Sequence, residues 1–140
     1  LAEIGLDMSR FPTAGHLAAW SGLAPGNNES AGKRLGGKTR KGNVTLKTTL
    51  IQSAKTAKKT SGSYFKAQFE RLTVKRGKNR AVVAVAHSML IAIYHMLKYG
   101  VPFNDLGEDY YNHFNTEKKI QHYLKKLQNL GWQSPSTASA

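Results

Sequence analysis

The 140-residue sequence has no cysteine and only eight acidic residues. Without cysteine the chain can form neither a disulfide nor a thiolate-rich zinc site. Its start lacks the basic and apolar segments of a signal peptide and has no initiator methionine, so we expect a fragment of a longer protein. The most apolar stretch, 81–97, is shorter than the about 20 residues of a membrane helix, and two histidines interrupt it. A buried central helix, and no membrane partner, is the better interpretation.

Positive charge is concentrated in one part of the chain. The 21 Lys and Arg residues give a formal net charge of +13. Fifteen of them lie between Lys33 and Arg80, where Glu70 is the only acid, so this segment carries fifteen bases less one acid, or +14. Such a field concentrates polyanions, which predicts nucleic-acid binding. The lysines at 55, 58 and 59 fit a solvated helix face as well as they fit a nucleic-acid contact.

Apolar residues recur at helical spacing in several segments, and no segment alternates as a strand would. The expected helices span 16–21, 44–59, 64–75, 80–99 and 116–130. Thr13 and Asn43 are placed to cap the first two, and Gly100 and Gly131 to end the last two.

Residues 26–43 carry five glycines, which predicts a loop without regular structure that is mobile until a ligand orders it. We therefore expect an all-α fold, a small helical bundle from which a glycine-rich basic loop projects. The domain should span 1–131, and the small polar residues of 132–140 should form a disordered tail.

Two familiar kinds of site are disfavoured. Five residues separate Gly26 from Gly32, and Arg34 stands where a nucleotide-binding P-loop has Ser or Thr, so the sequence fits a P-loop poorly. The five histidines lack the i, i+4 pairing of a metal site and are better explained as satisfied core residues. The acids of segment 105–109 fit a solvated helix start better than a cation site. We expect no metal and no cofactor in this chain.

Ser30 is the candidate nucleophile. A serine that attacks a phosphodiester needs access, a base for its proton, and cations to stabilise the charge on phosphate. The glycine-rich loop supplies access and cations, although no base is evident and a polar turn residue is the simpler alternative. The residues expected to bind phosphate are Lys33, Arg34, Lys38, Arg40, Lys41 and Arg80. Gly32, Gly42 and Asn43 are expected to shape the loop and its end.

Three blocks of sequence together resemble a known family. The blocks are 11–25 (FPTAGHLAAWSGLAP), 30–33 (SAGK) and 39–43 (TRKGN), followed by a helix with Leu46 and Leu50. Their order and spacing resemble the C-terminal domain of DEDD-type insertion-sequence transposases of the 110/116/902 type, the bridge-RNA-guided recombinases. The resemblance covers about residues 1–100, and Arg80 before an Ala-rich helix with His87 continues it.

This resemblance implies a function. In the family, a serine of the C-terminal domain attacks DNA and forms a phosphoserine link, and Ser30 matches it by position. The family's RuvC-like N-terminal domain, absent from this sequence, binds Mg²⁺; a guide RNA selects the DNA, and the protein acts as an oligomer in the bacterial cytoplasm, at the nucleoid. We therefore expect a DNA transposition enzyme whose isolated fragment is inactive. Ser21 and Ser53 remain poorer alternatives to Ser30.

Two other functions remain open. One is a non-catalytic DNA- or RNA-binding module that uses the basic loop as a clamp. The other is a basic structural protein associated with the ribosome. Both predict binding without a covalent protein–DNA adduct.

Overall fold

The computed structural model describes residues 2–26, 28–36, 38–39, 41–113 and 116–132. Two compact units make up the chain, the first reaching to Glu108 and the second starting at Asp109. Most of the described residues are helical, which confirms the predicted helical class. Residues 133–140, most of the predicted tail, lie outside the described part of the chain.

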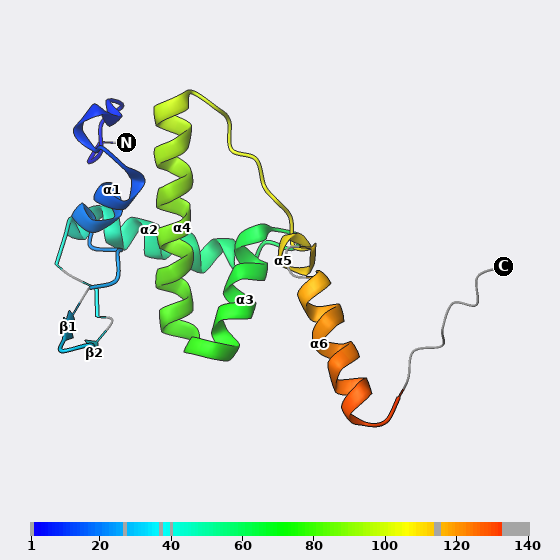
Figure 1. Ribbon diagram of the computed structural model, residues 1–140. Coiled ribbons are helices and arrows are strands. Elements are labelled where there is room, and N and C mark those ends of the chain that lie inside the picture. Colours follow the sequence, from blue (N-terminus) through cyan, green and yellow to red (C-terminus); the bar gives the residue numbers. More distant parts are fainter. Residues whose placement is uncertain (1, 27, 37, 40, 114–115, 133–140) are drawn as a thin grey trace. The chain divides into compact units, whose positions relative to one another are not determined.

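The first unit is built around one long helix, α4 (Lys78–Tyr99). Three other helices pack against it: α1 (Ala14–Trp20), α2 (Val44–Ala57) and α3 (Tyr64–Arg76) (Figure 1). Its buried residues follow helical spacing and form the centre of the core; they are Ala81, Val82, Val85, Ala86, Leu90 and Tyr94. By length and apolar composition α4 could also cross a membrane, but its packing against three helices is that of a core helix.

The ends of these helices are determined by local hydrogen bonds. The side chain of Thr13 caps α1 by accepting from the backbone N–H of His16, and Ser63 caps α3 by accepting from Lys66. Gly100 ends α4 in the left-handed conformation, with φ 64°. Asp105, in the segment after α4, accepts a 2.9 Å hydrogen bond from the backbone N–H of Tyr64 and so binds this segment to the start of α3.

A short 3₁₀ helix, η1 (Met8–Arg10), precedes α1 and was not predicted. The backbone N–H of Ser9 donates to the carboxylate of Asp7, which caps η1 and has its pKa lowered by this bond. Farther along, the buried hydroxyl of Tyr94 lies 3.0 Å from the carbonyl oxygen of Phe11. Lys98 donates to the same hydroxyl at 2.9 Å, and this bond raises the pKa of Lys98. The long helix thereby holds the segment that leads into α1.

The expectation of an irregular loop between α1 and α2 needs correction. This segment contains an antiparallel hairpin of β1 (Asn28–Ser30) and β2 (Lys33–Gly36). Ala31 and Gly32 connect the strands with φ of 50° and 74°. Positive φ at both central residues is typical of a type I′ turn, whose twist matches that of paired strands. The glycines that argued against a regular element here are instead compatible with a tight hairpin.

The second unit contains α5 (Tyr110–His113) and α6 (Thr116–Asn129). Two apolar residues of α6, Ile120 and Leu127, are both well exposed. Gly131, with φ 85°, follows the end of α6. Helix α5 begins directly after the acids of segment 105–109, so the predicted helix start lies there.

Candidate nucleic-acid interface

The base of the hairpin, residues 25–26, 38–39 and 41–43, is held together by hydrogen bonds, and we call it the neck. The backbone N–H of Gly26 donates to the carbonyl oxygen of Lys38 at 3.1 Å, and Pro25 forms an isolated bridge with Thr39. Lys47, in the first turn of α2, donates from Nζ to the hydroxyl of Thr39 at 3.0 Å. The two arms of the 26–43 segment are therefore joined below the strands, and one arm is attached to α2.

Gly42 packs against the end of α1 so closely that no side chain fits. A Cβ built on Gly42 would lie 2.3 Å from the backbone nitrogen of Gly22 and 2.4 Å from the carbonyl carbon of Ser21. Neither atom belongs to a flexible side chain, so a substitution here must move the backbone. The glycine predicted to shape the loop is thus the point where the second arm contacts α1.

Asn43 joins three parts of the first unit through its hydrogen bonds. Its backbone N–H donates to the carbonyl oxygen of Trp20 at 3.2 Å, and its Oδ1 accepts from the N–H of Leu46 at 2.8 Å, which caps α2. Its Nδ2 donates to Glu3 Oε2 at 2.6 Å. Asn43 therefore connects the start of α2 and the N-terminal segment through its side chain, and the end of α1 through its backbone N–H.

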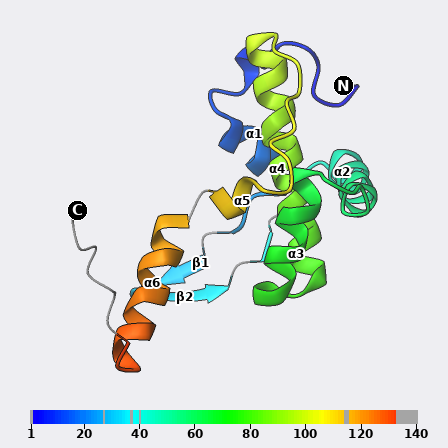
Figure 2. The same ribbon diagram turned by 90° about the vertical axis from the view of Figure 1, so that its right-hand side faces the viewer.

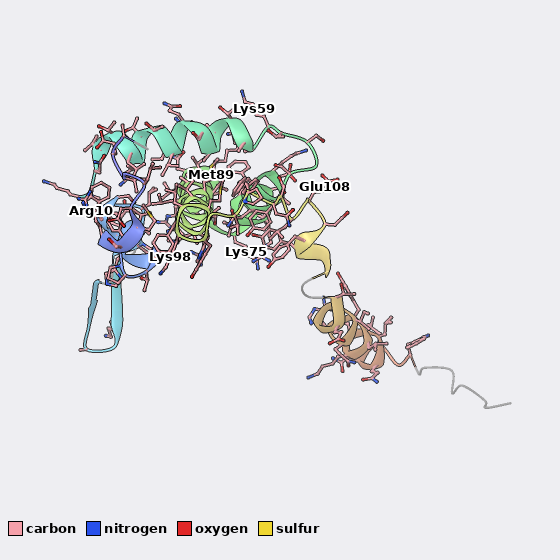
Figure 3. All side chains as sticks on the ribbon, turned by 90° about the horizontal axis from the view of Figure 1, so that it is seen from above. Arg10, Lys59, Lys75, Met89, Lys98 and Glu108 are labelled. Carbon is pink, nitrogen blue, oxygen red and sulfur yellow. The ribbon has the colours of Figure 1, made fainter. Side chains whose placement is uncertain are left out.

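Ser30 lies at the far end of the hairpin. It is the last residue of β1 and pairs with Lys33 across the two-residue turn, so its backbone is next to the tip. Its side chain is outside the part of the chain that the structure describes. Figure 3 shows the hairpin extending away from the helices on the side of α4 opposite α2. The residues of the tip, Ala31, Gly32 and Lys33, are exposed.

The predicted phosphate-binding residues fall into two places. Lys33, Lys38 and Lys41 are exposed in the hairpin segment. Arg40 and the side chain of Arg34 lie outside what the structure describes. Arg80 is exposed in the first turn of α4 and belongs to the connection between α3 and α4 rather than to the hairpin.

The alternative serines are poorly placed for attack on DNA. Ser21 is fully buried and donates to the carbonyl oxygen of Ala18 at 2.9 Å. Ser53 donates to the carbonyl oxygen of Thr49 at 3.0 Å within α2. A hydroxyl inside the core cannot meet a phosphodiester, and one bonded along a helix must first be released.

Sequence reasoning missed two contacts of the neck, Lys47 with Thr39 and Glu3 with Asn43. No periodicity marks either pair, because the partners are brought together only by the fold. Over the described residues, no three His, Asp or Glu side chains gather as a metal site would require.

Fold and charge together define a small basic helical domain with a hairpin held on its surface. The family model described as "Transposase IS116/IS110/IS902 family" matches residues 1–70, which include α1, the hairpin, its neck and α2. The chain belongs to this transposase family. Membership places it in the transposase class of enzymes, which act in DNA transposition and have DNA as a partner. No curated protein and no solved structure matches the chain.

Proposed function

We propose that this chain is the strand-transfer domain of its transposase, with Ser30 as the nucleophile. The observation that carries the proposal is the position of Ser30 beside the tip of a hairpin that projects from the helices. Family membership supports the reaction class, and the resemblance of segments 11–25, 30–33 and 39–43 to the C-terminal domain of these enzymes supports the residue.

The proposed step is a transesterification. The Ser30 hydroxyl oxygen attacks the phosphorus of a DNA phosphodiester and loses its proton to a base. The bond from phosphorus to one deoxyribose oxygen breaks, and that oxygen leaves and takes up a proton. The product is a phosphoserine that joins the protein to the cut strand. The hydroxyl of a DNA end then attacks the phosphorus of this phosphoserine, the bond from phosphorus to the Ser30 oxygen breaks, and Ser30 takes up a proton. One phosphodiester is thereby restored for each one broken, so no external energy source is needed.

The cations of the hairpin segment would hold the phosphate. Lys33 lies opposite Ser30 in the strand register, and Lys38 and Lys41 are exposed along the returning arm. Arg34 and Arg40 belong to the same segment, whereas Arg80, in the first turn of α4, would contact a different phosphate of the bound DNA. Positive charge near the scissile phosphate stabilises the extra negative charge of the transition state. The contacts of the neck, from Gly26 to Lys38 and from Lys47 to Thr39, would attach the segment that carries the nucleophile to the helices.

Further parts of the proposal concern the complete enzyme. A RuvC-like domain of the DEDD type would bring Mg²⁺, a guide RNA would select the DNA, and several copies would assemble at the bacterial nucleoid. In this proposal the metal belongs to that other domain, as the family resemblance implies. The fragment alone is therefore expected to bind DNA without recombining it.

The test uses the complete transposase and a nicked suicide substrate that traps a covalent intermediate. Ser30→Ala should abolish the protein–DNA adduct while DNA binding persists, and Ser53→Ala, the matched control, should form the adduct normally. An adduct that still forms with Ser30→Ala contradicts the assignment. If the unmodified enzyme forms no adduct on any substrate that it binds, the alternative of a non-catalytic DNA- or RNA-binding module is favoured.

A further inference from the structure

A second basic surface lies where α3 meets α4. The two helices are separated by Gly77 alone, whose φ of 80° allows the sharp change of direction. Four cations lie within six positions of this connection, and all four are exposed. They are Lys75, Arg76, Lys78 and Arg80, and with Gly77 we call them the α3–α4 turn.

Among the described residues, no acid pairs with the cations of this turn. The nearest acid in the sequence is Glu70, earlier in α3. Its carboxylate forms an ion pair at 3.9 Å with Lys66, which lies still farther from the turn along the chain. Over the described residues, none of the four cations forms an ion pair. Within the described part of the chain, the four cations of the turn are thus exposed and carry no ion-pair partner.

Two of these cations are placed where they disfavour the helix that carries them. Lys78 and Arg80 are in the first turn of α4, at the positive end of the helix dipole. This end also has no side-chain cap, so its backbone N–H groups are not satisfied by a neighbouring side chain. A surface that served only solubility would gain nothing from cations at this end. A bound phosphate would reverse the penalty, because it accepts from the N–H groups and pairs with the side chains.

The turn and the hairpin are arranged on one part of the unit. Figures 1 and 2 both place the hairpin at the level of the N-terminal end of α4, where the turn lies. In Figure 3, Lys75 lies on the side of α4 toward which the hairpin extends, whereas Lys59 points away from the opposite side, beyond α2. A single DNA molecule that reaches the hairpin can therefore also reach the turn.

We infer that the α3–α4 turn is a second contact for the DNA backbone, separate from the hairpin. It binds phosphate through Lys78 and Arg80 and through the free N-terminal end of α4, with Lys75 and Arg76 beside them. This inference rests on the proposal that the chain binds DNA, but it does not depend on Ser30 being the nucleophile. Under this inference the hairpin segment and the α3–α4 turn contact DNA, whereas the lysines of α2 form a solvated face that does not.

The test compares two double variants of the 140-residue chain with equal loss of charge. One is Lys78→Gln with Arg80→Gln, and the control is Lys55→Gln with Lys59→Gln on α2, where both lysines are exposed. Binding to a labelled DNA duplex is measured from 50 to 200 mM salt. Each phosphate contact contributes about 0.9 to the slope of log affinity against log salt, or roughly a 3.5-fold affinity loss over this range. The slope of the turn variant should be smaller in magnitude than that of the unmodified chain by about 2. The slope of the α2 control should stay close to that of the unmodified chain.

Thermal unfolding of the same variants separates binding from folding. The turn variant should melt at the unmodified temperature or above it, because two cations leave the positive end of α4. Equal slopes for the two double variants would overturn the inference, and so would weaker binding accompanied by a lower melting temperature. Loss of binding in the hairpin variant Lys33→Gln with Lys38→Gln, but not in the turn variant, would also overturn it and leave the proposed function intact. A covalent adduct that persists in Ser30→Ala would overturn the assignment of Ser30 as the nucleophile, but the α3–α4 turn would remain a DNA contact.

Discussion

Replacing Gly42 with alanine should destabilise the first unit, because the added Cβ has no space. The Cβ would lie 2.3 Å from the nitrogen of Gly22, well inside van der Waals contact, and the atoms around it are all backbone. To avoid this clash, the chain around Gly42 must move away from the end of α1. That movement strains the hydrogen bond from the backbone N–H of Asn43 to the carbonyl oxygen of Trp20. Overpacking of this kind costs about 1–3 kcal/mol. At about 4 °C per kcal/mol for a unit of this size, the melting temperature should fall by roughly 4–12 °C.

Gly15→Ala is the matched control for this change. Its Cβ would lie 3.5 Å from the Thr13 hydroxyl, an ordinary contact, and the residue is within α1. Alanine should therefore stabilise the helix by up to about 1 kcal/mol through its better helix propensity. Thermal unfolding followed by circular dichroism measures both variants. Equal melting temperatures for Gly42→Ala and the unmodified chain would refute the close packing of the loop against α1.

Three further changes test other parts of the fold, each by denaturant unfolding. Ala31→Asn should raise stability by about 0.5–1 kcal/mol, because asparagine tolerates the positive φ that alanine adopts here; a loss would argue against the type I′ turn. Asn43→Ala should lower stability by about 1–2 kcal/mol through loss of the α2 cap, whereas Glu3→Gln, which keeps an acceptor for Asn43, should cost less. Tyr94→Phe should cost about 1 kcal/mol or more, since the carbonyl of Phe11 loses its buried donor; an unchanged stability would exclude that bond.

The helices of this domain can be predicted from the sequence more readily than the segment between α1 and α2. Leu46, Leu50 and Ala54 repeat at helical spacing and are all buried, and Asn43 caps the helix that they belong to. The ends at Gly100 and Gly131 follow from residues that adopt positive φ readily. In each case the signal is local, so a short window of sequence contains it.

The hairpin could not be foreseen in the same way. Its strands are three and four residues long, and neither shows alternating apolar residues. Ala31 rather than asparagine precedes Gly32 in the turn, so the usual Asn-Gly signal of a type I′ hairpin is missing. The neck contacts of Lys47 and Glu3 join residues that are distant in sequence, and only the folded chain brings them together. Charge predicted a basic surface but could not divide it among α2, the hairpin and the α3–α4 turn.

The nucleophile is tested most directly by locating the covalent bond. The complete transposase is trapped on a suicide substrate, the DNA is digested, and the protein is cleaved with trypsin together with a protease that cuts after glutamate. Cleavage after Glu29 and Lys33 releases the peptide Ser30–Lys33, in which Ser30 carries the only hydroxyl group, and separates it from Ser21 and Ser53. Mass spectrometry should find the phosphate-linked nucleotide on this peptide. A nucleotide on any other peptide, with the Ser30 peptide unmodified, would contradict the account.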